Sequence, residues 1–268
     1  MTNADQYCLE KASPDGSSLY YALLFEDPDV RRKLLPLFAL HYEISACLTA
    51  SSDPGVIRVK LQWWSEELAR LSGQAPRHPV TTALLPVVVE NGTDIALFNR
   101  YLETTGTLLS RRAASLTASE WLEQMQSGLG ALWMAAAAIA NRQATPAPVL
   151  QQNGGTIFLV ELLQNMHYLI PRGIVFIPEE LRETPDEQGI ALVRFQTVFE
   201  TLEAQLAQDY PTLLRVAKQT GYYHRIMNRL ASAVCAEIRL DGYQLIRHKI
   251  VLTPLRKLWI ATRTRYLG

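Results

Sequence analysis

Apolar residues recur every three or four positions along almost the whole chain, which is the spacing that gathers them on one face of an α-helix. In the stretch from residue 30 to 49 one such face is made by Leu34, Leu37, Phe38, His41, Ile44 and Leu48. Pro36 predicts either a bend in this helix or its first turn, because proline lacks a backbone donor. A second helix is predicted from the face made by Val56, Val59, Trp63, Leu68 and Leu71, and it ends at Gly73.

The same spacing predicts further helices over residues 94–110, 118–141, 155–170, 192–220, 222–241 and 253–266. Only the segment 174–176 favours an extended conformation, and it is too short to found a sheet. Residues 145–153 indicate a loop or an interrupted helix, since they include Pro146 and Pro148. No repeat and no internal boundary is visible. The pattern therefore predicts an all-α fold with one domain over residues 1–268.

Composition allows a large core and gives no overall electrostatic field. Hydrophobic residues make up 48% of the 268 residues and charged residues 19%, which excludes a disordered chain. Lys plus Arg (26) equals Asp plus Glu (26), so we expect no nucleic-acid partner and only local basic patches. The three cysteines form no CxxC pair, and the first residues lack a targeting pattern, so we expect a cytoplasmic protein.

The most membrane-like stretch is residues 129–140. Its twelve apolar residues are too few to span a bilayer, and a buried helix is the expected structure. A peripheral position at the inner membrane is left open.

The usual enzyme motifs are absent, because the chain has no GxGxxG, P-loop, GxSxG or HExxH sequence. Its five histidines stand without a partner at metal-ligand spacing, and we expect them to be structural or exposed. The acidic pair Glu66 and Glu67 is expected to be solvated.

One long stretch is almost free of charge, since Glu161 is the single charged residue between Gln143 and Pro171. Its polar residues Gln164, Asn165 and His167 can form hydrogen bonds but cannot hold a divalent ion as carboxylates do. A buried core helix and the wall of a neutral ligand cavity are both consistent with this pattern.

Basic and aromatic residues provide the remaining candidates. Arg247, Lys249 and Lys257 could hold a phosphate, a diphosphate or a lipid headgroup, although a solvated helix face has the same pattern. Trp63 and Trp64 point about 100° apart on a helix, so one of them is expected at the surface as an anchor for a partner.

Several segments, read in order, resemble the squalene/phytoene synthase family of head-to-head prenyltransferases. They are SPDGSSLYYALLF, DVRRKLLPLFALHYEIS, LQWWSEELARL with PRHPV, GIVFIPEEL, and AEIRLDGYQLIRHKIVLTPLRKLW. The resemblance covers nearly the whole chain. It implies a helical isoprenoid-synthase bundle around a central cavity.

The resemblance also shows which family residues are replaced. The family binds magnesium through two aspartate-rich motifs, and their positions are occupied here by Ser45, Ala46, Thr49, Gln164 and Tyr168, with Tyr42 and Val160 nearby. None of these side chains offers magnesium a negative oxygen, so we expect no magnesium and no other cofactor. Glu43 and Glu161 are each expected to point about 200° away from the missing aspartates and not to replace them.

One branch of the family shares this loss, namely the mitochondrial factor that assists assembly of respiratory complex I, with its bacterial relatives. Two segments, FALHYEI and RVKLQWW, are similar to that branch. The similarity implies a subunit of a respiratory complex as a partner.

Three functions remain open. The first is a non-catalytic binding or assembly protein; the second is a prenyl-diphosphate enzyme in which Arg247, Lys249 and Lys257 replace the metal. The third is a carrier of an isoprenoid or quinone lipid, with Leu162 in its tunnel. The residues expected to line the cavity are Ser18, Tyr21, Phe38, Tyr42, Ser45, Val160, Gln164 and His167.

Overall fold

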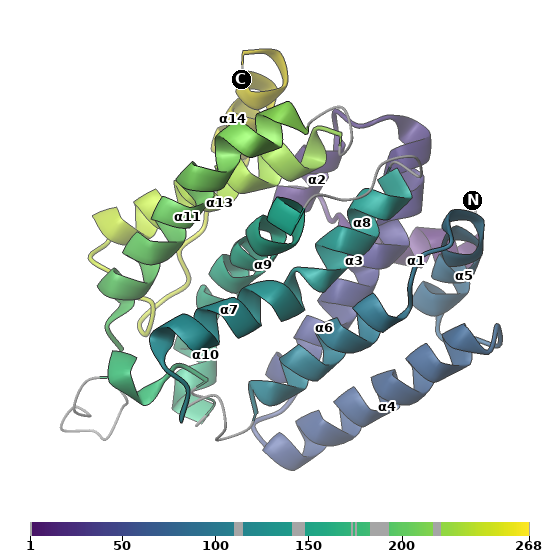
Figure 1. The fold of residues 1–268 in the computed structure, drawn as a ribbon, viewed down its shortest axis with the longest axis horizontal. Coiled ribbons are helices and arrows are strands. Elements are labelled where there is room, and N and C mark those ends of the chain that lie inside the picture. The colour runs from purple at the N-terminus through teal and green to yellow at the C-terminus, as the bar shows by residue number, and fades with distance from the viewer. Residues whose placement is uncertain are drawn as a thin grey trace.

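Two helices, α3 (Pro28–Thr49) and α9 (Pro148–Leu163), run through the middle of the structure (Figure 1). The computed structural model describes residues 2–109, 115–140, 148–172, 174, 176–182, 193–216 and 221–267. These residues form helices and no strand, which confirms the all-α fold class. Their buried apolar side chains join in one main cluster that reaches from Cys8 to Ala261.

The start of α3 is fixed by its first residues. The Asp27 carboxylate accepts hydrogen bonds from the backbone N–H groups of Asp29 and Val30, and Pro28 occupies the first turn. Pro36 lies eight residues inside the helix and is buried. The alternative that Pro36 marks the first turn is therefore wrong.

The central position of α9 follows from its sequence, because its buried residues lie on every side. Around it pack α7 (Ala118–Leu129), α8 (Ala131–Ala140), α11 (Phe195–Arg215) and α13 (Tyr223–Leu240). The helix begins at Pro148. Of the two expectations for residues 145–153, a loop or an interrupted helix, the loop is therefore wrong from Pro148 onward, and residues 145–147 lie outside the described part. Proline fits there because the first turn needs no backbone donor.

Small residues allow α9 to lie close to α7 and α8. A Cβ atom built on Gly155 would overlap the backbone of Gln126, and one built on Gly130 would overlap the Gln151 carbonyl oxygen. Gly130 also separates α7 from α8, where one helix over residues 118–141 was expected. The glycines are thus explained by close backbone approach.

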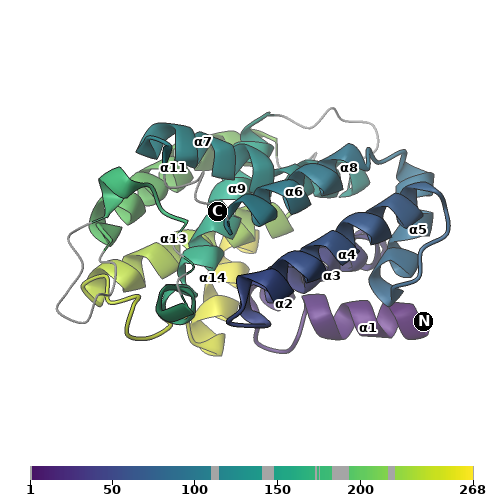
Figure 2. The same ribbon diagram turned by 90° about the horizontal axis from the view of Figure 1, so that it is seen from below.

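The remaining helices surround this centre (Figures 1 and 2). They are α1 (Asn3–Ala12), α2 (Ser18–Leu23), α4 (Pro54–Ser72), α5 (Pro79–Asn91), α6 (Ala96–Thr107), α10 (Met166–Leu169) and α14 (Pro254–Tyr266), with short 3-10 turns η2 (Ile170–Arg172) and η3 (Glu179–Leu181). Helix α1 packs along α3 and α5, and α14 packs on α13 and α2.

Most predicted helices are present within a few residues of their expected ends. Helices α1, α2 and α5 were not predicted. Ile174 and Phe176 belong to no strand, and Val175 between them lies outside the described residues. The apolar stretch 129–140 forms the buried helix α8, as expected. None of the described helices combines the length and the apolar content that crossing a bilayer demands.

Candidate functional site

Two adjoining pockets lie between α3, α9 and the segment that leads into α14. We call them the lysine pocket, which Lys11, Lys249 and Lys257 line, and the histidine pocket, which His41 lines together with Lys249. Tyr42, Glu161 and Lys249 line both pockets. The two pockets therefore form one candidate site with a shared wall.

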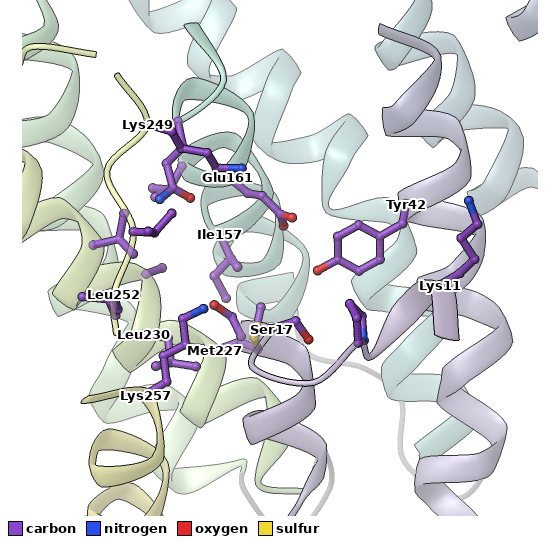
Figure 3. A pocket seen from close by; sticks show the side chains of 17 residues that line it. Lys11, Ser17, Tyr42, Ile157, Glu161, Met227, Leu230, Lys249, Leu252 and Lys257 are labelled. Atoms are coloured by element: carbon purple, nitrogen blue, oxygen red, sulfur yellow. The ribbon is translucent and has the colours of Figure 1, made fainter. Parts of the chain in front are cut away.

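The lysine pocket combines positive charge with an apolar wall (Figure 3). Lys11 comes from α1, Lys249 from the segment after α13 and Lys257 from α14. Among the described residues that line it, Glu161 is the single acidic one. The apolar wall comes from α9, α13 and the segment before α14 and consists of Ile157, Val160, Met227, Leu230, Ala231, Val234, Val251 and Leu252.

Two of these lysines have only neutral hydrogen-bond partners. Lys249 Nζ donates to Asn165 Oδ1 at 3.1 Å, and Lys257 Nζ donates to the Gly16 carbonyl oxygen at 2.8 Å. Among the described residues, no carboxylate lies within ion-pair distance of either ammonium group. Burial lowers the pKa of Lys257, and the neighbouring Lys249 lowers it further. An anion in this pocket would relieve that repulsion.

The third lysine is neutralised outside the pocket. Lys11 Nζ lies 3.0 Å from Glu43 Oε1, and the Tyr7 hydroxyl donates to the same oxygen at 2.5 Å. Glu43 lines neither pocket of the site. Its carboxylate instead contacts Tyr7 and Lys11 of α1.

The histidine pocket contains a chain of polar side chains. His41 Nε2 lies 3.5 Å from Glu161 Oε2, and His41 Nδ1 lies 2.7 Å from the Tyr101 hydroxyl. The Ser45 hydroxyl lies 3.1 Å from the Tyr101 hydroxyl. The His41 ring stacks on Phe158 with ring centroids 3.7 Å apart and planes 6° from parallel. Packing and hydrogen bonds thus hold the imidazole in one orientation.

Glu161 is kept charged by its neighbours. Burial raises the pKa of Glu161, but His41, Lys249 and the Tyr42 hydroxyl together outweigh burial and lower it. Burial raises the pKa of Tyr42 and of Tyr101, and the Glu161 charge raises both further. The two phenols remain protonated donors beside an ionised carboxylate.

The position of Glu161 corrects the sequence-based expectation. Figure 3 shows its carboxylate directed toward Tyr42 on α3, not away from it. Helix α9 is rotated so that Glu161 lies between the two pockets, and Asn165, just after the helix, lines the histidine pocket. A neutral ligand cavity, one of the two alternatives for the uncharged stretch, is also wrong, since lysines from α1, α14 and the segment before α14 line the pocket.

Four of the five residues at the replaced aspartate positions line the candidate site, and Tyr168 does not. Ser45, Ala46 and Thr49 line the histidine pocket, and Gln164 lines the lysine pocket. Gln164 donates through Nε2 to the Ile250 carbonyl oxygen. The hydroxyl of Tyr168 lines neither pocket and donates to the Thr49 carbonyl oxygen at 2.6 Å.

Of the expected cavity residues, Ser18, Tyr42, Ser45 and Val160 also line the site. Tyr21, Phe38 and His167 lie outside both pockets, contrary to expectation. Phe38 packs edge-on against Trp133 and Tyr223, Tyr21 packs against Tyr20, and His167 Nδ1 lies 3.2 Å from the Gln164 carbonyl oxygen. Aromatic side chains in the core fill space that the sequence suggested for a ligand.

Only some of the basic and tryptophan candidates lie where the sequence predicted. Arg247 is exposed, donates to Gln244 Oε1 at 3.0 Å and lines neither pocket, unlike Lys249 and Lys257. Trp64 is 4% exposed and Trp63 is 40% exposed, so one tryptophan lies at the surface. Leu162 lines the histidine pocket.

Sequence reasoning did not assign Lys11, His41 or Tyr101 to the site. His41 was assigned to the core because it occupies an apolar position of α3, and it is indeed buried. Its ring still borders the pocket. Lys11 and Tyr101 come from distant helices, so no local pattern could have indicated them.

The site's donors do not fit the magnesium ions that aspartate-rich motifs would hold. Magnesium requires carboxylate and other oxygen ligands, and the two pockets offer one carboxylate and three ammonium groups. Among the described residues, no three His, Cys, Asp or Glu side chains converge in a way that could hold a metal ion.

Comparisons with known proteins agree with this architecture. The structure matches the crystal structure of a dehydrosqualene synthase in complex with ligand, with a TM-score of 0.70 and 15% sequence identity, over 98% of this chain and 95% of that one. At this identity the likeness shows the fold alone. No curated protein sequence matches the chain. The profile of squalene/phytoene synthase matches residues 13–257, and the chain therefore belongs to the squalene/phytoene synthase family.

Proposed function

We propose that the protein binds an isoprenoid diphosphate in the lysine pocket without magnesium and does not ionise it. The observation that carries the proposal is the donor set of this pocket, in which lysines stand with a single carboxylate. The family consists of prenyltransferase-type proteins. The proposal of binding without reaction applies to this chain alone.

The pocket suits both ends of such a ligand. Lys249 and Lys257 offer ammonium groups without a carboxylate partner among the described residues, and ammonium groups bind phosphate oxygens as point charges. The side chains of Ile157, Leu230 and Leu252 offer an apolar wall for the isoprenoid tail. One molecule can use both surfaces because they line the same pocket.

Release of diphosphate needs strong stabilisation of the charge that develops on the leaving group. Metal ions supply this in a magnesium enzyme, by acting as Lewis acids on the phosphate oxygens. Here the half-buried Lys257 and the exposed Lys249 would have to supply it alone, while Glu161 at the same pocket repels the leaving group. Binding without turnover follows from this balance.

Calorimetric titration with farnesyl diphosphate tests the proposal. We expect the same affinity in excess magnesium and in a chelator, and no release of inorganic diphosphate. Lys249→Gln and Lys257→Gln should each weaken binding at least roughly 10-fold, since a hydrogen bond to a charged group contributes about 1.5–3 kcal/mol. Lys60→Gln, an exposed lysine on α4 away from the site, is the matched control and should bind normally.

Other outcomes favour the competing functions. Magnesium-dependent binding with diphosphate release would establish an enzyme with altered ligands. Binding of a quinone or an isoprenoid alcohol with an affinity that neither lysine substitution changes would establish a lipid carrier instead.

We propose partner binding as a second candidate function, favoured by the outer surface of α4. Val56, Val59 and Trp63 lie on one side of this helix and are 42%, 70% and 40% exposed. Exposed apolar groups with a tryptophan are typical of protein interfaces. The resemblance to the complex I assembly branch suggests a respiratory complex subunit at the inner membrane as the partner.

Deletion of the gene should then lower respiratory complex I without changing the isoprenoid profile. The double variant Val59→Ser with Trp63→Ser should fail to restore the complex, while the wild-type chain restores it. Normal levels of complex I in the deletion strain would contradict this second function. The proposal of diphosphate binding would be unaffected, because calorimetry tests it separately.

A further inference from the structure

Helix α14 has apolar residues on two opposite sides. Ile260 and Ala261 are buried against the bundle, while Leu255, Trp259 and Tyr266 on the other side are 80%, 59% and 67% exposed. With about 100° per residue, positions 255, 259 and 266 fall within about 40° of one another around the helix. Folding requires only the buried side. The exposed apolar side therefore needs another explanation.

The same region is positively charged, although the chain as a whole is neutral. Residues 242–267 include no Asp or Glu, and their basic residues are Arg247, Lys249, Arg256, Lys257, Arg263 and Arg265. Basic residues beside an exposed apolar stripe are typical of helices that lie at a membrane surface. The local charge thus complements an anionic surface.

A groove between α13 and α14 gives a second, independent observation. Arg229 and Arg263 line it, with Tyr210 and Trp259. The Arg229 guanidinium lies 3.8 Å from the centre of the Tyr210 ring, and the Arg263 guanidinium lies 5.2 Å from that of Trp259. Neither arginine has an ion-pair partner in the described part of the chain, while Arg256, also in the groove, pairs with Glu237.

Beside the groove, Tyr210 has an unsatisfied polar atom. The Tyr210 hydroxyl is buried and has no hydrogen-bond partner among the described residues. Phosphate oxygens can accept hydrogen bonds from both guanidinium groups. The groove therefore offers hydrogen-bond donors to a phosphate group. The apolar side chain of Trp259 lines the same groove.

We propose that α14 binds the surface of an anionic phospholipid bilayer, with Leu255, Trp259 and Tyr266 inserted at the interface and a lipid phosphate in the groove. Tryptophan and tyrosine are enriched where headgroups meet acyl chains. Arginine binds the phosphate, and the surrounding basic residues add attraction to the negative surface. Figure 1 shows α14 at the outer edge of the bundle, where a flat surface can reach it.

Co-sedimentation of the full chain with phospholipid vesicles tests this surface. The chain should bind vesicles that contain phosphatidylglycerol, and it should bind pure phosphatidylcholine much more weakly. Leu255→Ser with Trp259→Ser should lower binding at least ~10-fold by removing apolar contact. Arg229→Gln with Arg263→Gln should lower binding to the anionic vesicles roughly 30-fold, from about one factor of five for each basic residue.

The control is Val89→Ser on α5, which removes an exposed apolar group elsewhere and should leave vesicle binding unchanged. Circular dichroism checks that each variant is folded. Equal binding of wild type and the arginine variant would overturn the phosphate groove. Self-association of the chain that depends on Leu255 and Trp259, without vesicle binding, would instead identify the surface as a dimer interface.

Discussion

Gly155→Ala is expected to lower the free energy of unfolding by about 3 kcal/mol, the upper part of the range for overpacked sites. The added Cβ would overlap the Gln126 carbonyl oxygen and crowd its Cα atom, which are backbone atoms and cannot rotate away. Helix α9 must then move from α7, and every side chain at their contact loses packing. Urea denaturation followed by circular dichroism measures the change.

Gly106→Ala is the matched control, since Gly106 lies in α6 and an added Cβ would meet nothing within 4 Å. Alanine favours the helix over glycine, so this variant should be about 0.5 kcal/mol more stable than the wild type. Similar effects at the two glycines would contradict the close approach of α9 and α7.

Glu67→Gln is expected to destabilise the protein by about 3 kcal/mol at neutral pH. The Glu67 side chain is buried, and its carboxylate accepts hydrogen bonds from Arg70 Nε, the backbone N–H groups of Arg77 and His78, and the Thr81 hydroxyl. Burial raises the pKa of Glu67, but these hydrogen bonds outweigh burial and lower it to about 2. The magnitude follows from the distance of this pKa from the ordinary value of 4.5.

The pH dependence gives a sharper check. Because the folded pKa is below the unfolded one, the contribution of Glu67 is fully present above about pH 4.5 and is lost as the pH falls toward 2. The stability difference between wild type and Glu67→Gln should shrink over this range. Glu66→Gln removes the neighbouring, mainly exposed carboxylate and should change stability by less than about 0.5 kcal/mol. A difference that is constant with pH would contradict the assigned pKa.

Glu67 also shows where sequence reasoning is limited. Its neighbour Glu66 and a basic surrounding suggested a solvated pair, but three of the four donors to Glu67 come from the segment that leads into α5 and from its first turn, ten or more residues away. A buried carboxylate can be recognised only when its partners are known. The local sequence pattern does not place them.

Helix positions were more predictable than the site. The apolar spacing of α4 and α13 depends on residues within each helix, so their ends could be predicted closely. The rotation of α9 against α3 depends on contacts between helices, and the Gly155 contact with Gln126 is one of them. An alignment to the family's motif placed Gln164 opposite α3, whereas Glu161 and Asn165 line the pocket beside that helix.

Because the two pockets share a wall, a ligand in one pocket should affect binding in the other. Tyr42, Glu161 and Lys249 line both, and each has a limited number of hydrogen-bond positions. A ligand that draws Lys249 or Tyr42 toward one pocket withdraws that group from the other. Binding at the two pockets should therefore be mutually antagonistic, and thermodynamic linkage requires the antagonism to be equal in both directions.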